Sequence, residues 1–282
     1  MNIPIIYAGN RGVFDGMLIS VLSIIKYCNQ PLNVFLLTMD LTDRNPAFLP
    51  VTEEQRACLE TICRERNPES RVTRLDVGAL YRKTMMDSPN AETGYTPYCF
   101  LRLYADQLTE IPDKAIYLDT DTVLCDDIAK LYAKNVDGYE LAGGRDRYGR
   151  WFFGANYINS GVLLLNVKEL RRTGSFRRVL DLCARKKIFL PDQTAINRSV
   201  KRKKYLPRCF NEQKRTREDT VIRHFSMTIV WLPRFRTQNV KPWQVEKVHN
   251  VLKEHRHDAI LNEYLRRKAK FDKDFTEKEN LL

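Results

Sequence analysis

The chain of 282 residues is 43% hydrophobic and carries a formal net charge of +12. This hydrophobic content is enough to bury the core of one large domain. Its longest apolar runs, such as residues 161–167, are far shorter than the roughly 20 residues of a membrane-spanning helix, so no such helix is expected. The first ten residues lack the basic region and cleavage site of a secretion signal and indicate a first strand instead. We therefore expect a cytoplasmic protein.

The positive charge is concentrated between Arg171 and Arg217, a segment that we call the basic belt. Such a belt attracts polyanions, including nucleic acid, anionic lipid headgroups and phosphorylated substrates, although a solvated face also explains any single lysine or arginine. Aromatic residues interleave the belt too sparsely for a platform that stacks single-stranded nucleic acid. Nucleic acid is therefore not an expected partner, whereas peripheral contact with an anionic membrane at its inner face remains open.

Seven cysteines are scattered singly along the chain, in apolar or helical contexts. No C-x-x-C pair is present, and no histidines stand at the spacing of a zinc site. We expect reduced and mostly buried thiols.

Strands and helices alternate in the first half of the chain. Apolar periodicity predicts strands at residues 3–9, 32–40, 70–78 and 114–119, and helices at residues 15–28, 53–66 and 100–108. Thr52 is a plausible N-cap of the second helix. This alternation predicts a mostly parallel central sheet flanked by helices, in which ligands bind beyond the carboxyl ends of the strands.

The second half is more irregular. It contains a short strand at residues 140–144, a loop rich in arginine and aromatic residues to Tyr157, an apolar strand at 158–166 and a helix at 167–172. Short strands follow at 204–210 and 221–226, then an aromatic and proline-rich loop to Trp243 and helices from Gln244 onward. We expect one domain over residues 1–245 and a peripheral helical extension over residues 246–282.

Two carboxylates, Asp119 and Asp121, follow the apolar strand that begins at Lys114. Side chains two residues apart on an extended segment point to the same side, so these carboxylates can converge on one point. Converging carboxylates repel each other unless a cation lies between them. The alternative is that both aspartates simply solvate a turn.

One of the four histidines, His224, ends an apolar strand in the same way as Asp121. Strand-end geometry can bring the two together, and two carboxylates with an imidazole suit Mn²⁺ or Mg²⁺, the nitrogen favouring Mn²⁺. Such a cation stabilises a diphosphate that departs with growing negative charge. The other histidines, His249, His255 and His257, lie in a charged segment, and we expect them on a solvated helix face.

Several motifs in a fixed order resemble glycosyltransferase family 8, which contains glycogenin and the bacterial lipopolysaccharide galactosyl- and glucosyltransferases. They are YAGN at the first strand, FLRLYADQL, IYLDTDTVL, YINSGVLLLNVKELR, LPDQTAIN, and RHF followed by KPW. The resemblance covers most of the chain. It implies the nucleotide-diphospho-sugar transferase fold called GT-A, and transfer of a hexose from a UDP-sugar to a hydroxyl of a glycan or other cell-surface polymer, with retention at the anomeric carbon.

The resemblance also implies roles for individual residues. Asp119, Asp121 and His224 would bind the metal, and Asp192 and Gln193 would lie beside the anomeric carbon. The donor would contact Ala8, Asn10, Arg102, Asp119, Thr120, Asp121, Asp146, Asn159 and Lys241. The chain departs from the family pattern in three places. Met227 replaces a glycine that many members have, and residues 228–239 lengthen the interval between His224 and Lys241. Residues 11–13 stand where family members often have an aromatic residue that stacks near the base.

For the mechanism we expect a front-face, dissociative route, because Gln193 is a poor nucleophile; Asp192 is then a candidate stabiliser of the sugar cation. Two alternatives remain open from the sequence. The motif LDTDTV also fits the D-x-D-x-[TV] of haloacid-dehalogenase-like phosphatases, although that motif usually opens the fold. In a non-enzymatic alternative, the basic belt binds a polyanion or membrane and the aspartates are structural.

Overall fold

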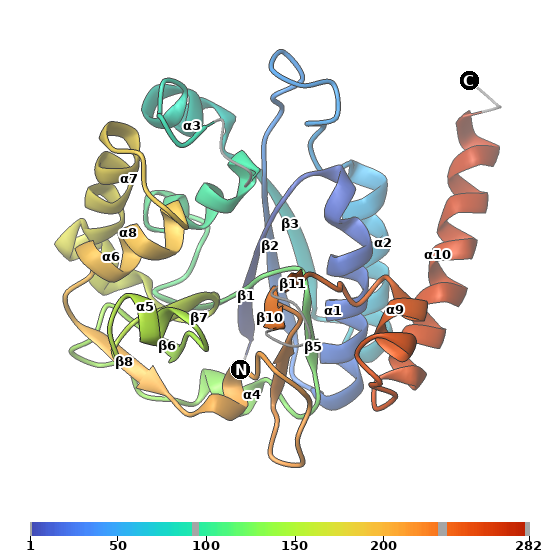
Figure 1. Ribbon diagram of the computed structural model, residues 1–282. Coiled ribbons are helices and arrows are strands. Elements are labelled where there is room, and N and C mark those ends of the chain that lie inside the picture. The colour runs from blue at the N-terminus through green and yellow to red at the C-terminus, as the bar shows by residue number, and fades with distance from the viewer. Residues whose placement is uncertain (1, 92–95, 231–235, 280–282) are drawn as a thin grey trace.

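A computed structural model of the chain describes residues 2–91, 96–230 and 236–279, and side chains up to residue 274. Within these ranges, seven strands form the central sheet in the order β3-β2-β1-β4-β7-β6-β8 (Figure 1). The strands are β1 (Ile3–Ala8), β2 (Leu32–Thr38), β3 (Arg71–Asp76), β4 (Lys114–Leu118), β6 (Leu141–Arg145), β7 (Ile158–Asn166) and β8 (Lys203–Leu206).

The sheet is mostly parallel, as the alternation of strands and helices predicts. Strands β1, β2, β3 and β4 run parallel to one another, with Ile6 of β1 opposite Tyr117 of β4. Strand β7 runs antiparallel to both β4 and β6, and Val162 pairs with Leu118. Strands β1 and β4 therefore end side by side, and the residues that follow them share one edge of the sheet.

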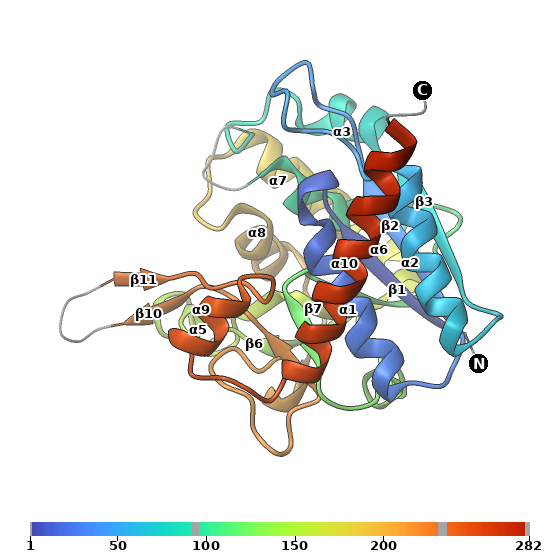
Figure 2. The same ribbon diagram turned by 90° about the vertical axis from the view of Figure 1, so that its right-hand side faces the viewer.

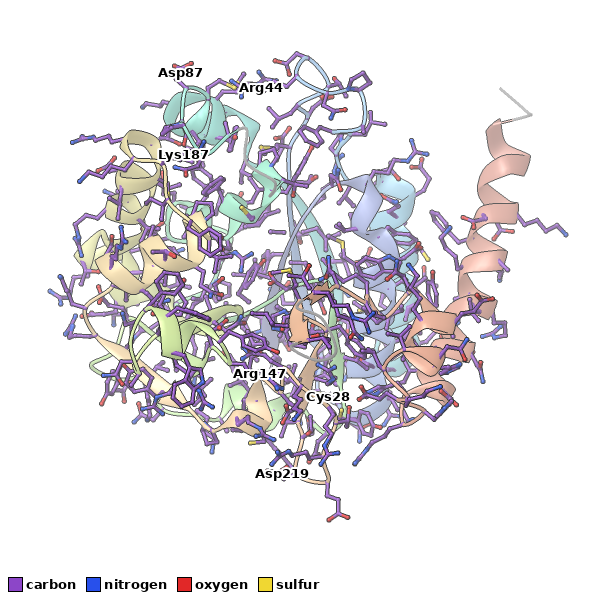
Figure 3. All side chains as sticks on the ribbon, in the orientation of Figure 1. Cys28, Arg44, Asp87, Arg147, Lys187 and Asp219 are labelled. Atoms are coloured by element: carbon purple, nitrogen blue, oxygen red, sulfur yellow. The ribbon has the colours of Figure 1, made fainter. Side chains whose placement is uncertain are left out.

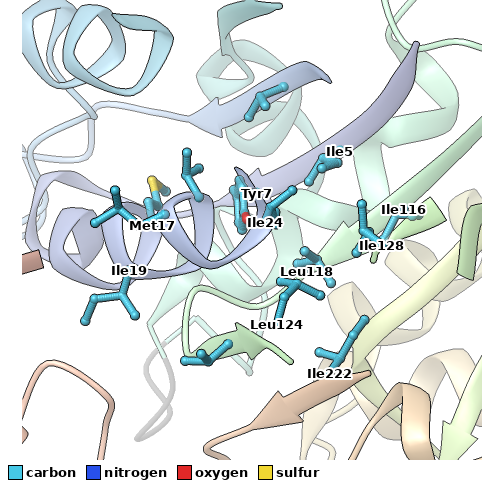
Figure 4. Packing of buried hydrophobic residues seen from close by; sticks show 14 of the residues in the cluster. Ile5, Tyr7, Met17, Ile19, Ile24, Ile116, Leu118, Leu124, Ile128 and Ile222 are labelled. Carbon is cyan, nitrogen blue, oxygen red and sulfur yellow. The ribbon is translucent and has the colours of Figure 1, made fainter. Parts of the chain in front are cut away.

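Both faces of the sheet are buried, which explains the continuous apolar strands. On β4, Ile116 and Leu118 pack in the core on one face with α1 (Phe14–Tyr27) and α2 (Glu53–Arg66) (Figure 4). Ala115 and Tyr117 alternate with them and pack on the other face with η2 (Pro97–Gln107), a 3-10 helix, and α7 (Ser175–Arg185). The strand in front of the two aspartates is thus fixed from both sides.

Shorter elements complete the chain. They are η1 (Arg11–Val13), α3 (Gly78–Met85), β5 (Thr122–Leu124), α4 (Ala129–Tyr132), α5 (Gly149–Phe152), α6 (Val167–Thr173), α8 (Pro191–Ser199), η3 (Arg208–Phe210), β9 (Ile222–His224), β10 (Thr228–Val230), β11 (Arg236–Gln238), α9 (Val245–Asn250) and α10 (Asp258–Glu279). Strand β5 pairs antiparallel with β9, outside the central sheet.

The long predicted elements are found near their expected places, but several shorter elements differ from the prediction or were not predicted, among them α5 in the loop expected before Tyr157. The helix expected at residues 100–108 is the 3-10 helix η2 rather than an α-helix. The loop expected before Trp243 contains an antiparallel pair, β10 and β11. Helix α3 was not predicted. The N-cap at Thr52 is confirmed, and it forms a complete capping box with Gln55.

Helix α10 packs along α1 at one side of the molecule, distant from α5 to α8 (Figures 1 and 2). The rings of Phe271 and Phe14 lie 4.8 Å apart, and Arg267 makes two hydrogen bonds of 2.6 Å to Glu65. None of the described helices is both long enough and apolar enough to cross a bilayer. A domain boundary at residue 245 remains a prediction.

Of the three histidines expected on a solvated helix face, His255 is exposed and His249 is partly exposed, but His257 is not. His257 is buried and lies within hydrogen-bond distance of Thr216 and Glu254, so the expectation is wrong for it. His249 lies on α9, and its ring contacts Asp258 at 2.7 Å. All seven cysteines are free thiols, three of them buried and the others partly buried.

Candidate functional site

The two aspartates converge through a turn rather than through an extended strand. Strand β4 ends at Leu118 and β5 begins at Thr122, so Asp119 and Asp121 lie in the connection between them. The sequence analysis predicted this convergence from the alternation of side chains along an extended strand. The aspartates do converge, but they lie in a turn and not in a strand. Strand β9 pairs with β5 so that Thr122 lies opposite His224, and this register brings the imidazole beside the turn.

The three side chains form one compact group. One ligand-capable atom from each of Asp119, Asp121 and His224 lies within 4.8 Å of the others. The Nε2 atom of His224 is 3.2 Å from Oδ1 of Asp121 and 3.8 Å from Oδ2 of Asp119. Asp121 and His224 are buried, and Asp119 is partly exposed. The group therefore has one side that is open to a ligand.

A chain of amide hydrogen bonds fixes the tautomer of His224. The carboxylate of Asp146 only accepts, so Asn159 must donate to it through Nδ2, at 2.9 Å. The Oδ1 atom of Asn159 therefore accepts, and it does so from Gly161 N and from Asn211 Nδ2, both at 3.0 Å. The remaining oxygen of Asn211 lies 3.1 Å from Nδ1 of His224 and accepts its proton. In the neutral imidazole, which is the form that binds a metal ion, Nε2 then carries the lone pair.

This arrangement fits a divalent cation. The Nε2 lone pair faces Oδ1 of Asp121, which is buried and makes no hydrogen bond with any described residue. Two such electron-rich atoms need a proton or a metal ion between them. A Cβ built on Gly161 would lie 2.2 Å from Cε1 of His224 and 2.6 Å from Oδ2 of Asp119. Only glycine leaves this cradle open.

Lys241 is the nearest cation to the metal-ligand group. Its Nζ atom donates to Oδ2 of Asp121 and, at 3.3 Å, to the carbonyl oxygen of Phe225. Burial alone would raise the pKa of Asp121, but the positive charge that Lys241 presents to it is the largest opposing cause, and the pKa lies below its usual range. Asp121 is therefore a carboxylate at neutral pH, as a metal ligand must be.

Arg102 links the metal-ligand group to the next part of the site. This buried guanidinium lies 2.9 Å from Oδ1 of Asp119 and 3.6 Å from Oδ2 of Asp192, and it donates to the carbonyl oxygen of Ser160 at 2.7 Å. It also stacks 4.3 Å from the ring centroid of Tyr117. Burial opposes its charge, but the neighbouring acidic groups raise the pKa of Arg102, so it stays cationic.

Asp192 and Gln193 lie in the first turn of helix α8, which starts at Pro191. Both side chains are buried, and Ser160 Oγ donates to Asp192 at 3.1 Å. Burial raises the pKa of Asp192, and nearby Arg102 partly opposes this shift.

The carboxamide of Gln193 is held at both ends. Its oxygen accepts from Asn159 Nδ2 at 3.1 Å and from Ser160 N at 3.0 Å. Its nitrogen donates to Asp146 at 3.2 Å. Asp146 and Gln193 therefore belong to the same network as the histidine.

Most of the residues predicted for the site therefore lie in one continuous network. Its members are Arg102, Asp119, Asp121, Asp146, Asn159, Asp192, Gln193, His224 and Lys241. Ala8 ends β1 beside the end of β4. The backbone of Thr120 packs closely against Gly16 of α1, because a Cβ built on Gly16 would lie 2.5 Å from the carbonyl oxygen of Thr120. Asn10 is the N-cap of η1 and accepts from Gly12 N at 3.1 Å.

Three residues of the network were not predicted. Asn211 orients His224, Ser160 contacts Asp192 and Gln193, and the hydroxyl of Tyr117 donates to Asp119 at 2.7 Å. Ser160 and Tyr117 lie within motifs that drew attention to their neighbours. Asn211 follows η3 and opens a run of polar residues, 211–215, and no local signal in the sequence distinguishes it from its neighbours.

Known proteins with similar sequences are glycosyltransferases. A probable glycosyl transferase, Gly, of Streptococcus gordonii is 28% identical over 134 residues, which are 46% of this chain and 19% of that protein. Glycosyltransferase GlyA of Streptococcus pneumoniae serotype 4 is 36% identical over 35% of this chain and 14% of its own length. A probable galacturonosyltransferase-like protein of Arabidopsis thaliana is 26% identical over 58% of this chain and 50% of its own length. The chain thus spans half or less of these relatives.

Solved structures match over nearly the whole chain. The bifunctional glycosyltransferase WbbM superposes with a TM-score of 0.68 at 16% identity, over 94% of this chain and 51% of that chain. The galactosyltransferase LgtC, solved with donor and acceptor sugar analogs, superposes with a TM-score of 0.65 at 17% identity, over 93% of this chain and 96% of that chain. These likenesses show the GT-A fold. The sequence profile of glycosyl transferase family 8 matches residues 4–247, and the chain belongs to this family.

Proposed function

We propose that the protein is a retaining glycosyltransferase that moves a hexose from a UDP-sugar to an acceptor hydroxyl of a glycan or other cell-surface polymer. The observation that carries the proposal is the group formed by Asp119, Asp121 and His224, in which a histidine lone pair faces an unpartnered carboxylate oxygen. These residues would hold Mn²⁺, or Mg²⁺, with Mn²⁺ favoured by the nitrogen ligand. Bound there, the cation would neutralise charge on the departing diphosphate.

Lys241 is the second source of positive charge. It now pairs with Asp121, and its half-buried ammonium can turn from that carboxylate to an incoming phosphate oxygen. Ala8, Asn10 and Thr120 lie at the adjoining edge of the sheet, where we place the uridine end of the donor.

The network beyond Arg102 would bind the sugar. Asp146, Asn159 and Gln193 offer both acceptors and donors to sugar hydroxyls, and their mutual hydrogen bonds hold them in place. The Gln193 carboxamide is engaged at both ends and is not a nucleophile. We therefore favour a front-face, dissociative route in which Asp192 stabilises positive charge on the sugar and the leaving diphosphate takes the proton of the acceptor hydroxyl. A glycosyl adduct trapped on Asp192 or Gln193 would contradict it.

The family match supports the transferase proposal over the phosphatase and over the non-enzymatic alternative. The relatives named as glycosyltransferases and the LgtC structure with donor and acceptor sugar analogs point in the same direction. We also propose that the protein is cytoplasmic and that the basic belt favours peripheral contact with the inner face of an anionic membrane.

The metal-ligand group gives the test. Asp119→Ala and Asp121→Ala should each abolish Mn²⁺-dependent UDP binding measured by calorimetry, because each removes a carboxylate ligand. Treatment of the wild type with EDTA should have the same effect. Asp126→Ala is the matched control, since Asp126 lies in the same acidic stretch but pairs with Lys130 at the surface. Unchanged UDP affinity in both site variants would refute the proposal, and a screen of UDP-sugar hydrolysis with Mn²⁺ would identify the hexose.

A further inference from the structure

Four large aromatic side chains are exposed together next to the proposed sugar site. The exposed fractions are 76% for Trp151, 65% for Phe152, 44% for Phe153 and 71% for Phe189. We call these residues the aromatic tip. The first three end the short helix α5, and the fourth precedes α8, yet the rings of Phe153 and Phe189 lie only 6.3 Å apart. Large exposed aromatic side chains gathered on two neighbouring segments are typical of an interaction site.

The tip is built on the sugar-site network rather than on a free loop. Asp146 accepts hydrogen bonds from the backbone of Tyr148 and Gly149, where α5 starts. Phe153 stacks on Tyr157 at 4.9 Å, and the hydroxyl of Tyr157 is 2.8 Å from Oγ1 of Thr194, a buried residue of α8. The residues that shape the proposed sugar site therefore also hold the aromatic rings in their exposed positions.

The segments that carry the tip are strongly basic. Arg145 and Arg147 precede α5, Arg150 lies within it, and the exposed residues 185–187 (Arg, Lys, Lys) precede Phe189. The Arg150 guanidinium lies 5.3 Å from the ring centroid of Trp151. The acidic residue among them, Asp146, is committed to the sugar-site network. Figure 3 shows Arg147 and Lys187 on the half of the molecule that holds α5 to α8, opposite α10.

Aromatic rings surrounded by arginine and lysine match the headgroup region of an anionic membrane, where aromatic rings settle and cations meet phosphate. Stacking on a glycan explains the tip less well. Consecutive residues on a helical turn project about 100° apart, so one sugar ring cannot cover Trp151, Phe152 and Phe153 together. A lipid layer that surrounds a projecting tip can cover all of them.

We propose that the aromatic tip inserts into the interface of an anionic membrane and sets the sugar site against the lipid surface. Docking does not depend on the transferase activity. Its consequence, that the acceptor is presented on a lipid, rests on the proposed function.

The test is sedimentation with phosphatidylcholine vesicles that contain about 30% phosphatidylglycerol, without donor or metal. The wild type should bind these vesicles, bind pure phosphatidylcholine much more weakly, and retain part of its binding at about 0.5 M NaCl, where charge alone is screened. Trp151→Ser/Phe152→Ser should bind at least about tenfold more weakly. Leu265→Ser, a change at a 48% exposed leucine on α10, is the matched control and should bind like the wild type.

Three outcomes would overturn the proposal. They are failure of the wild type to bind anionic vesicles, equal binding by the tip variant, and a concentration-dependent dimer that the tip variant abolishes, which would mean that a second copy covers the tip.

Phe189→Ser tests the tip from its other segment if the double variant does not fold. Mn²⁺-dependent UDP binding, measured on every variant, should be unchanged. Its absence in the wild type would sink the proposed function and leave the docking result standing.

Discussion

At the residue scale, the site depends on which atoms carry protons. A carboxylate that can only accept, Asp146, stands at one end of the amide chain, and Nδ1 of His224 stands at the other. Asn159 and Asn211 lie between these two groups. Once Asn159 donates to Asp146, the amide group of each asparagine has one orientation that satisfies its neighbours. The outer residues therefore set the lone pair of Nε2 without touching the proposed cation, which is the usual task of residues behind a metal ligand.

Asn211→Ala should weaken Mn²⁺ binding by about 10- to 100-fold, because the ring of His224 loses the acceptor that fixes its tautomer and orientation. The measurement is a calorimetric Mn²⁺ titration without donor. Asn197→Ala is the matched control: Asn197 also supports β7, through Ile158, but has no contact with His224. Equal Mn²⁺ affinity of Asn211→Ala and the wild type would show that the amide chain does not position the ligand.

At the element scale, short segments rather than long ones position the chemistry. The turn between β4 and β5 presents the aspartates, and three-residue β9 presents His224. The 3-10 helix η2 presents Arg102 with its guanidinium buried between Asp119 and Asp192. Periodicity finds long helices and buried strands, but three-residue strands and 3-10 turns fall below its resolution. The ends of predicted strands therefore indicated Asp119, Asp121 and His224, whereas the family motifs indicated the other predicted site residues.

The capping box of α2 gives a prediction at this scale. Thr52 Oγ1 accepts from Gln55 N at 3.2 Å, and the Gln55 side chain accepts from Thr52 N at 3.0 Å. Thr52→Ala should lower the free energy of unfolding by about 1 kcal/mol, because the first turn loses an acceptor. Thr52→Ser keeps the hydroxyl and should retain most of that stability. Urea unfolding compares the three proteins, and an equal loss in both variants would assign the effect to the lost methyl group.

At the scale of the whole molecule, one buried acid in η2 makes stability depend on pH. Both carboxylate oxygens of Asp106 are buried without a hydrogen bond to any described residue. Burial raises the pKa of Asp106 to about 6, and Arg177 and Arg171 oppose the shift only in part. Between about pH 4 and pH 6 the folded protein therefore binds more protons than the unfolded chain, and stability falls as the pH rises.

Asp106→Asn should raise the free energy of unfolding at pH 7.5 by at most about 3 kcal/mol, since the variant buries no charge. The gain should shrink towards zero as the pH falls below about 4, because the wild-type carboxyl then becomes protonated in the unfolded chain as well. Urea unfolding across this range measures it. Asp113→Asn, a change at an exposed aspartate nearby, should have little effect at any pH. A gain that does not vary with pH would exclude ionisation of Asp106 as its cause.

The sequence by itself determined the α/β class, the order of the long elements, the family resemblance and most of the residues that converge at the site. Buried strands and amphipathic helices have periodic signals, and the acidic motif follows such a strand at a fixed distance. What only the tertiary structure decided is how these residues meet. The register of β5 against β9 brings His224 to Asp121, and Asn211 reaches that histidine from a separate segment. Those contacts join segments far apart in the chain, and no local pattern encodes the distance between them.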